Sequence, residues 1–299
     1  MFDWLSSYHQ FLVDVTLIDI LLVLSVVILF QCGLFSMATA GFAAIGAYTS
    51  ALLVTDAGWP TALGIPAAAV SGAVLATLFG LPVLRLRGIY LALGSLALAQ
   101  VIVLGIANVD FTNGVFGISN IPQDIGTEWL VAIVLVVLIV LEIVHRSHVG
   151  RAMQAIRLDE RTASGLGVNI FAYRTGVFAA SGALAGLAGA LEAHRTTVIS
   201  PDQYNFPLLV MVFTYALVGG VGHWIGAVVA TVAFRVIEEN LEFAGSDWES
   251  FIYGGILVVT MILAPGGLAS RATWRPLQRR LGPLRTRRDA AAPSTAATP

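Results

Sequence analysis

Lysine is absent from the chain, and all 16 of its basic residues are arginines. A P-loop nucleotide site needs a lysine that reaches the terminal phosphates of the nucleotide. The sequence therefore contains no P-loop motif, and any ATP that the protein uses would be hydrolysed by another chain. Charged residues of either sign are also scarce, at 11% of the sequence, which is less than half the share typical of soluble domains.

Only one cysteine, Cys32, is present, which excludes a disulfide within the chain. His145 and His148 have a spacing that can place two imidazoles on one face of a helix, but Arg146 lies between them and no cysteine is near. We therefore expect neither a metal site nor a cofactor bound by this chain. The G-x-S-x-G motif of serine hydrolases is missing too, so we expect no enzymatic activity.

Long apolar runs dominate the rest of the sequence. Hydrophobic residues make up 57% of the chain, and its mean hydropathy is +0.84. A membrane-spanning helix needs about 20 mainly apolar residues. Runs near this length occupy residues 15–34, 38–54, 61–84, 88–107, 129–144 and 175–191, followed by a longer run over 208–237 and a short one over 251–264. The sequence therefore predicts an all-α, polytopic membrane helix bundle.

Glycines at positions 219, 220 and 222 interrupt the longest run, so the count of transmembrane segments is eight or nine. The positions of the arginines distinguish between these two counts, because short cytoplasmic loops are enriched in arginine. If the break separates two spans, the arginine clusters within 85–87, 146–174 and 271–288 all fall on one side. We therefore favour nine crossings, with the N-terminus outside and the C-terminus in the cytoplasm. Arg195 is then the one loop arginine on the wrong side.

The chain reads as one membrane domain with a tail. No loop is long enough for a soluble domain, so we assign residues 1–270 to a transmembrane domain with a cytoplasmic loop over 147–174. Residues 271–299 form a basic tail that we expect to be disordered. Its position directly after a span favours contact with anionic membrane lipid over nucleic acid. The first apolar run is expected to remain as a span, because no positive segment precedes it as in a secretory signal.

Small residues recur at helical spacing in two of the runs. Gly182 and Gly186 form a G-x-x-x-G pair, and Gly72, Ala76 and Gly80 repeat at every fourth position. Such faces let helix backbones approach closely in a membrane. They predict a compact bundle and do not identify a cargo.

Few ionisable residues lie inside the apolar runs. Asp19 and Arg235 are the clear cases, and we expect both, like Glu142, to lie near a membrane edge where side chains reach water. Ion-coupled transporters usually bury carboxylates near the membrane centre, and none is visible here. Gln100 is the most central strongly hydrogen-bonding side chain, and it could line a pathway or bond to a neighbouring helix.

Residues 147–169 are the most informative segment, with the sequence SHVGRAMQAIRLDERTASGLGVN. Between Gly150 and Gly165, one side of a short helix could carry the apolar residues Ala152, Ala155, Ile156 and Ala163. Such a helix at the membrane surface could dock into a groove of a soluble partner. The alternative is a solvated basic loop that serves only to set topology.

This segment resembles the cytoplasmic loop of permeases from bacterial branched-chain amino acid ABC importers, where a G-R-A-x-x-A-I-R-x-D-E stretch contacts the ATPase. Further stretches resemble the family in the same order, at 40–48 (AGFAAIGAY), 84–92 (LRLRGIYLA), 112–122, 184–190 (LAGLAGA), 200–201, 219–222 and 265–268. Thr39 departs from the family pattern, which often has His or Gln there, and this leaves the cargo open.

The resemblance implies the ABC importer permease fold and a membrane-spanning permease subunit that translocates branched-chain amino acids with ATP hydrolysed by separate subunits. It implies a second, usually different permease subunit, two ATPase subunits that bind Mg-ATP, and a periplasmic binding protein, in the bacterial inner membrane. A urea or short-chain amide permease of the same family, or a secondary transporter or channel, are the alternatives.

The resemblance also assigns roles to residues. The ATPase-coupling residues would be Gly150, Arg151, Ala155, Ile156, Arg157, Asp159, Glu160, Gly165, Leu166 and Gly167. Candidate pathway-lining residues are Gly41, Gly46, Tyr48, Tyr90 and Gln100.

Overall fold

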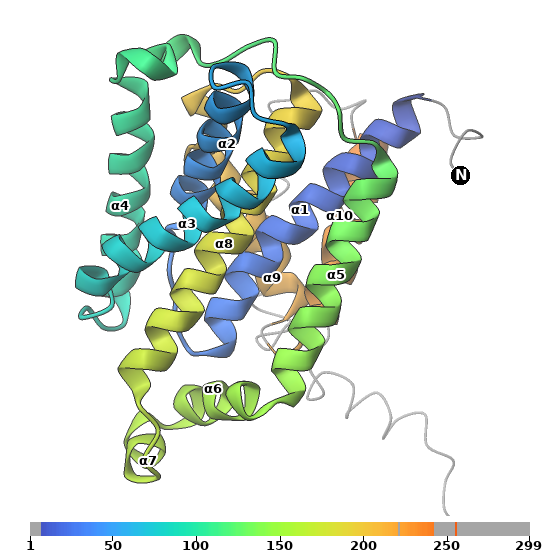
Figure 1. The fold of residues 1–299 in the computed structure, drawn as a ribbon. Helices are drawn as coiled ribbons and strands as arrows, with labels where there is room; N and C mark the ends of the chain where they lie inside the picture. The colour runs from blue at the N-terminus through green and yellow to red at the C-terminus, as the bar shows by residue number, and fades with distance from the viewer. Residues whose placement is uncertain (1–6, 221, 242–254, 256–299) are drawn as a thin grey trace, which may run out of the picture.

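The computed structural model describes residues 7–220, 222–241 and 255. Eight helices form an elongated bundle (Figure 1): α1 (Ser7–Gln31), α2 (Thr39–Thr55), α3 (Thr61–Val83), α4 (Ile89–Ala107), α5 (Thr127–Arg146), α8 (Ile170–Thr196), α9 (Phe206–Gly219) and α10 (Trp224–Leu241). Within the described ranges, pairing between extended segments is limited to one bridge, between Ile118 and Ile199. The predicted all-α bundle is confirmed for this part of the chain.

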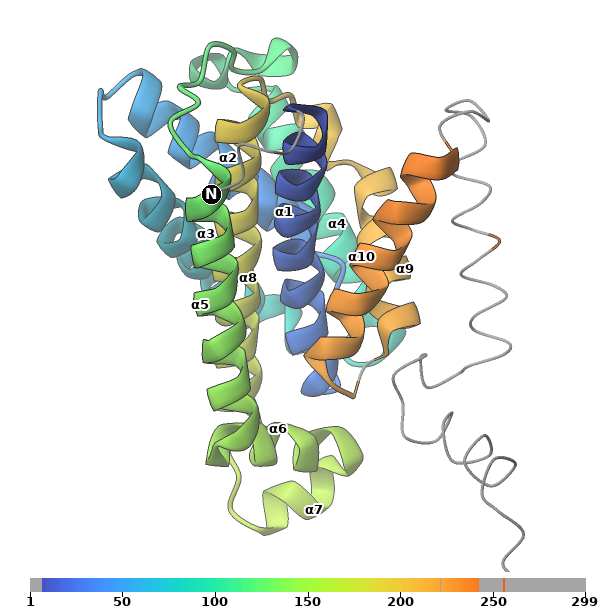
Figure 2. The same cartoon turned by 90° about the vertical axis from the view of Figure 1, so that its right-hand side faces the viewer.

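The short helices gather at the two ends of the bundle. α6 (His148–Leu158) and α7 (Glu160–Gly165) lie at one end, in the connection between α5 and α8 (Figures 1 and 2). The 3-10 helices η1 (Asp110–Thr112), η2 (Gly114–Phe116) and η3 (Pro201–Tyr204) lie at the opposite end (Figure 1). We call these the α6–α7 end and the η end.

Helix α8 packs against α1, α2 and α3 and forms the centre of the bundle. A Cβ atom at Gly46 of α2 would lie 2.1 Å from the carbonyl oxygen of Gly186, and one at Gly72 of α3 would lie 2.3 Å from that of Gly182. Only glycine allows backbones to approach so closely. The packing role predicted for Gly182 and Gly186 is confirmed.

The number of crossings stays a prediction. Within the described residues, five helices are long and apolar enough to span a membrane, namely α1, α3, α4, α5 and α8, and two shorter apolar helices are α2 and α9. Helix α10 has 18 residues but carries charged residues in its last two turns. The last predicted span, at 251–264, lies outside the described residues apart from residue 255, and the tail over 271–299 lies wholly outside them.

The glycine break in the longest apolar run is confirmed. α9 ends at Gly219, and α10 begins at Trp224 and packs against α9 (Figure 2). Gly220 has a φ of +93°, a conformation that favours glycine. A Cβ atom at Gly219 would lie 2.4 Å from the Cα of Ala227, so this glycine also sets how closely the two helices approach.

Helices α1 and α8 extend beyond the apolar runs that predicted them, because polar residues also belong to these helices. α1 begins at Ser7 rather than 15, and α8 runs from Ile170 to Thr196 rather than over 175–191. In the added turns Asp14 pairs with Arg195 at 2.8 Å, with side chains 2% and 16% exposed. His194 is buried and contacts the Ser50 hydroxyl and the Pro122 carbonyl oxygen, each at 2.9 Å. Once paired, these polar groups can remain in a helix inside the bundle.

Arginines concentrate at the α6–α7 end. Arg87, from the first cluster, and Arg174, from the second, line the same cavity there, so these two arginines lie at the same end of the bundle; the side of the membrane stays a prediction. The third cluster lies outside the described residues. Arg195, the exception, lies toward the η end, where its ion pair with Asp14 accounts for its position.

Candidate coupling element

The α6–α7 end carries a separate helical unit, residues 147–169, that we call the coupling element. Its first helix, α6, runs across the end of the bundle (Figure 1). Ser147 caps it by accepting a hydrogen bond from the Val149 N–H at 3.1 Å. Met153 and Ile156, each 2% exposed, share one side of the helix and face the bundle. The amphipathic helix predicted here is confirmed for Ala152, Ala155 and Ile156 in α6, whereas Ala163 lies in α7, beyond a break at Asp159.

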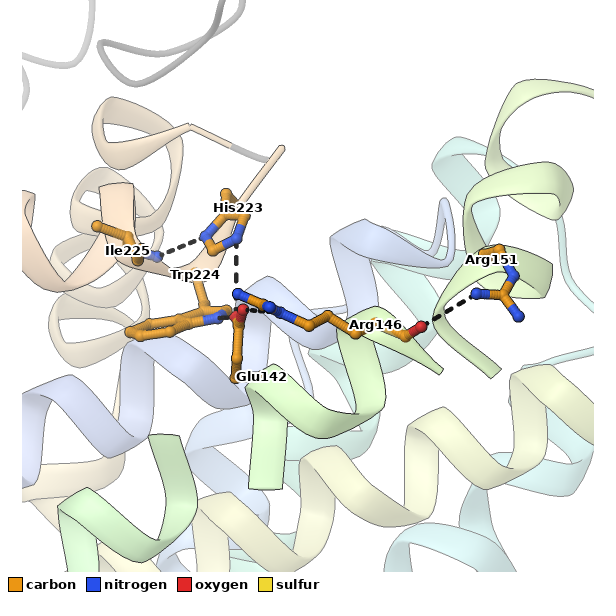
Figure 3. A network of polar contacts seen from close by, with 6 residues as sticks. All are labelled: Glu142, Arg146, Arg151, His223, Trp224 and Ile225. Carbon is orange, nitrogen blue, oxygen red and sulfur yellow. Dashed lines mark hydrogen bonds and ion pairs between the residues drawn. The ribbon is translucent and has the colours of Figure 1, made fainter. Parts of the chain in front are cut away.

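A tight turn joins α5 to α6. A Cβ atom at Gly150 would lie 2.4 Å from the carbonyl oxygen of His145, so another residue would force the two helices apart. The Arg151 guanidinium then reaches back and donates to the carbonyl oxygen of Arg146 at 3.1 Å (Figure 3). The turn fixes the direction in which α6 leaves the bundle.

The second helix, α7, depends on Asp159 at its N-terminus. The Asp159 carboxylate accepts hydrogen bonds from the Arg161 N–H at 2.8 Å and from the Thr162 hydroxyl at 2.8 Å. These bonds, together with one from the Thr162 N–H, stabilise the ionised form and hold the pKa of Asp159 below its usual value of 3.8. The helix ends at Gly165, and just beyond it the φ of +83° at Gly167 lets the Val168 N–H reach the carbonyl oxygen of Ala163.

Two contacts tie the coupling element to the bundle. Glu160, the first residue of α7, forms an ion pair with Arg174 in the first turns of α8. Gly33, just after α1, approaches α6 so closely that a Cβ atom there would lie 3.3 Å from the Cα of Arg157. A displacement of the coupling element would therefore reach α1 and α8 directly.

Glu142, near the end of α5, connects α10 to the place where the coupling element begins. Its carboxylate accepts hydrogen bonds from Arg146 at 2.5 Å and from the indole N–H of Trp224 at 2.8 Å (Figure 3). The imidazole of His223 lies 3.8 Å from the same carboxylate. Because Trp224 begins α10, this network fixes the start of α10 to the end of α5. The side chain of Glu142 is 27% exposed, as expected at an edge of the bundle.

Two leucines stand out from the coupling element. Leu158 at the end of α6 is 87% exposed, and Leu166 after α7 is 78% exposed. Gly165 and Gly167 beside them are also exposed. Both leucines lie outside the bundle, on the side of the element that does not contact it. The sequence interpretation included Leu166 but missed Leu158, Met153 and Arg174.

The residues of the predicted coupling set lie together in this one element, and they divide by exposure. Gly150 and Ile156 are buried, and Ala155 and Glu160 are partly buried, so these four hold the element on the bundle. Those exposed to the surroundings are Arg151, Arg157, Asp159, Gly165, Leu166 and Gly167.

The comparison with known proteins decides the family. Residues 8–261 match the family described as branched-chain amino acid transport system / permease component. The chain belongs to this family.

Among its relatives in this permease family are the high-affinity branched-chain amino acid transport system permease proteins LivM of Salmonella typhimurium and Escherichia coli. Each is 32% identical over 271 residues, which cover 79% of this chain and 64% of the relative. The chain thus spans less than two thirds of the length of these relatives. A probable LivM of Methanocaldococcus jannaschii is 26% identical over 236 residues, covering 69% of this chain and 67% of the relative. No solved structure matches the chain.

The loop over residues 112–122, which resembles the permease family, contains glycines that its backbone conformation requires. Asn113, Gly114 and Gly117 all have positive φ angles. A Cβ atom at Gly117 would lie 1.9 Å from the carbonyl oxygen of Ile199, and Ile118 exchanges backbone hydrogen bonds with Ile199. The glycines therefore allow the loop after α4 to lie against the segment after α8 at the η end.

The candidate pathway residues lie on two helices that contact each other, α2 and α4. Gly41 and Gly46 lie at helix contacts, and Tyr48 is buried at 3% exposure. Tyr90 is 70% exposed on the outer face of α4, and Gln100 is partly buried on the same helix. Their pathway role stays a prediction.

Asp19 belongs to a network of ion pairs and hydrogen bonds that joins α1, α9 and α10, and its depth in a membrane stays a prediction. Asp19, in the middle of α1, is 4% exposed and accepts a hydrogen bond from Arg235 of α10 at 2.5 Å. Arg235 also donates to Glu238 at 2.9 Å, and Tyr215 donates to the other oxygen of Glu238. Asp19 and Arg235 thus pair with each other, and the side chain of Arg235 remains 25% exposed. Glu238 belongs to α10.

Histidines form no recognisable metal centre in the described part of the chain. His145 and His223 lie with ring centroids 4.7 Å apart. No group of three or more His, Cys, Asp or Glu residues suited to a metal ion occurs among the residues that the structure describes.

Proposed function

We propose that this chain is the membrane-spanning permease subunit of an ABC importer for branched-chain amino acids, with the α6–α7 end in the cytoplasm of a bacterial cell. Two separate ATPase subunits bind Mg-ATP and contact the coupling element, a second permease completes the pathway, and a periplasmic protein delivers the cargo. Family membership and the arginines at the α6–α7 end support this assignment.

The coupling element is the observation that carries the proposal. Both of its helices have side-chain N-caps, its buried side packs against the bundle, and Leu158 and Leu166 lie on its exposed side. Its contacts lead to α8 through Glu160 and to the end of α1 through Gly33. Closure of the ATPases would push this unit, and the small-residue contacts of α8 would let the helices shift between two packings.

The buried cluster around Arg235 keeps a secondary transporter as the second candidate. Asp19 is buried and Glu238 is partly buried, and ion-coupled carriers use carboxylates in such positions, although Arg235 compensates part of their charge. Uptake by vesicles that contain this chain and a partner permease but no ATPase separates the two candidates. We expect no uptake without the ATPases.

The test replaces the exposed apolar surface of the coupling element. In Leu158→Ser/Leu166→Ser we expect ATPase association in nanodiscs to weaken about tenfold or more, because exposed anchors dominate such interfaces. ATP-driven uptake should fall with it. The matched control is Phe116→Ser, which changes a 94% exposed apolar residue at the η end and should leave ATPase association unchanged.

A second variant uses the charged and glycine positions of the same unit. Replacing Glu160 and Gly165 together breaks the pair with Arg174 and stiffens the end of α7. Unchanged association and unchanged uptake in both this variant and the leucine variant would remove the coupling assignment.

A further inference from the structure

A cavity of about 470 Å³ opens at the α6–α7 end, beside the coupling element. Three parts of the chain form its walls: the connection from α1 to α2, the turn from α3 to α4, and the pair Glu160 and Arg174. Pockets that hold small ligands usually measure about 300 to 1,000 Å³. The cavity is large enough for a small solute and a few waters.

Most of the wall is apolar. Leu34 and Leu91 are buried at 2% and 4% exposure and form the inner part of the cavity. Phe35, Leu86 and Ile89 are 40%, 40% and 70% exposed and form its open side. Branched alkyl groups gain free energy from contact with such a wall because apolar surface leaves water.

The remaining wall is charged. Arg87 and Arg174 bring two guanidinium groups to the cavity, and Glu160 brings one carboxylate. Arg174 is already paired with Glu160, and its side chain is 13% exposed. Arg87 forms no ion pair within the described residues. The lining thus has one positive charge in excess, carried by a guanidinium that can bind a carboxylate through two hydrogen bonds.

We propose that this cavity is a binding site for a zwitterionic amino acid with an apolar side chain on the α6–α7 side of the bundle. Arg87 binds the carboxylate, Glu160 accepts from the ammonium group, and the leucines of the inner wall hold the side chain. The inference rests on the proposed function for its cargo class, and adds a site where that cargo pauses after passing the bundle.

The charges that line the cavity predict which ligands bind more tightly. Because the lining is positive overall, a carboxylate contributes more to binding than an ammonium group does. A branched carboxylic acid without the amine should therefore bind better than the matching amine without the acid. Since Glu160 belongs to both the cavity and the coupling element, an amino acid held there also touches the unit that the ATPases are proposed to move.

Binding of radiolabelled leucine to the full-length chain in lipid nanodiscs tests the site without ATPases or delivery protein. In Arg87→Gln we expect the affinity for leucine to fall at least about tenfold, the usual effect of losing a hydrogen-bonded charge partner. Arg85→Gln is the matched control, because it removes the same charge from the same turn outside the cavity, and its affinity should stay within about twofold of the parent. The competitors 4-methylpentanoate and isoamylamine should displace leucine in that order.

Two results would overturn the site: equal leucine affinity in the Arg87 and Arg85 variants, or displacement by isoamylamine as strong as by leucine. Phospholipid that copurifies with the parent but not with Arg87→Gln, together with no leucine binding, would assign the cavity to a lipid headgroup and also end the proposal. ATP-driven uptake by the assembled transporter is measured in parallel. If uptake is intact while binding fails, only the site is lost; if uptake is absent, the proposed function fails.

Discussion

At the scale of single residues, glycines set how closely the central helices approach. A Cβ atom at Gly189 of α8 would lie 2.0 Å from the carbonyl oxygen of Ala43, a backbone atom that cannot turn away as a side chain does. Gly176, on the same helix, has no atom within 4 Å of such a position. Replacing each of these two glycines by alanine therefore distinguishes the effect of helix packing from the effect of helix propensity.

We predict that Gly189→Ala destabilises the chain by about 1–3 kcal/mol, the usual effect of inserting atoms into a packed core. Gly176→Ala should be neutral or stabilising by up to about 1 kcal/mol, because alanine favours the helix. Thermal unfolding in detergent measures both, with a thiol dye that reacts with Cys32, since this only cysteine is 0% exposed in the folded chain. Equal melting temperatures for the two variants would show that the α2–α8 contact is looser than described.

At the scale of elements, sequence reasoning succeeds where a pattern is local. The apolar runs predicted the long helices, and the spacing of Ala155 and Ile156 predicted the amphipathic α6. It failed where a polar residue depends on a distant partner, as Asp14 does on Arg195, because one sequence does not show which residues meet. The same reason explains why Arg174 was missed as the partner of Glu160.

Within the coupling element, α7 has only six residues, so its cap has a large effect on whether the helix forms. We predict that Asp159→Ala loosens α7, while Asp159→Ser, which keeps a side-chain oxygen at the cap, preserves it. Hydrogen exchange at the Arg161 and Thr162 amides measures the difference. Faster exchange in the alanine variant alone is expected, and equal protection in both would mean that packing alone holds α7.

The pH response of this cap has a definite sign. Because the pKa of Asp159 is held below its usual 3.8, the carboxylate contributes stability that is fully present above that usual value. The contribution is lost as the pH falls through the lowered pKa of the folded chain. Hydrogen exchange of α7, corrected for its intrinsic rate, should therefore show constant protection between pH 5 and pH 8 in the parent chain, and a drop in that window would contradict this cap.

At the scale of the whole molecule, the two ends of the bundle differ in chemistry. The α6–α7 end carries arginines and the coupling element, while the η end is closed by the loops that pair Ile118 with Ile199. Arginine-rich short loops remain in the cytoplasm because moving their charge across a membrane is unfavourable. The proposed function requires that these two ends lie on opposite sides of the membrane.

Labelling in intact cells tests that requirement, and the chain is suited to it because replacing Cys32 by alanine removes its only thiol. In this background, a cysteine is introduced by Gln154→Cys on the exposed side of α6 or by Phe116→Cys at the η end. A membrane-impermeant maleimide should label the Phe116→Cys chain in whole cells and the Gln154→Cys chain only after the membrane is opened. Labelling of Gln154→Cys from outside would place the coupling element away from cytoplasmic ATPases. An ATP-driven mechanism through residues 147–169 would then be impossible, whatever the family.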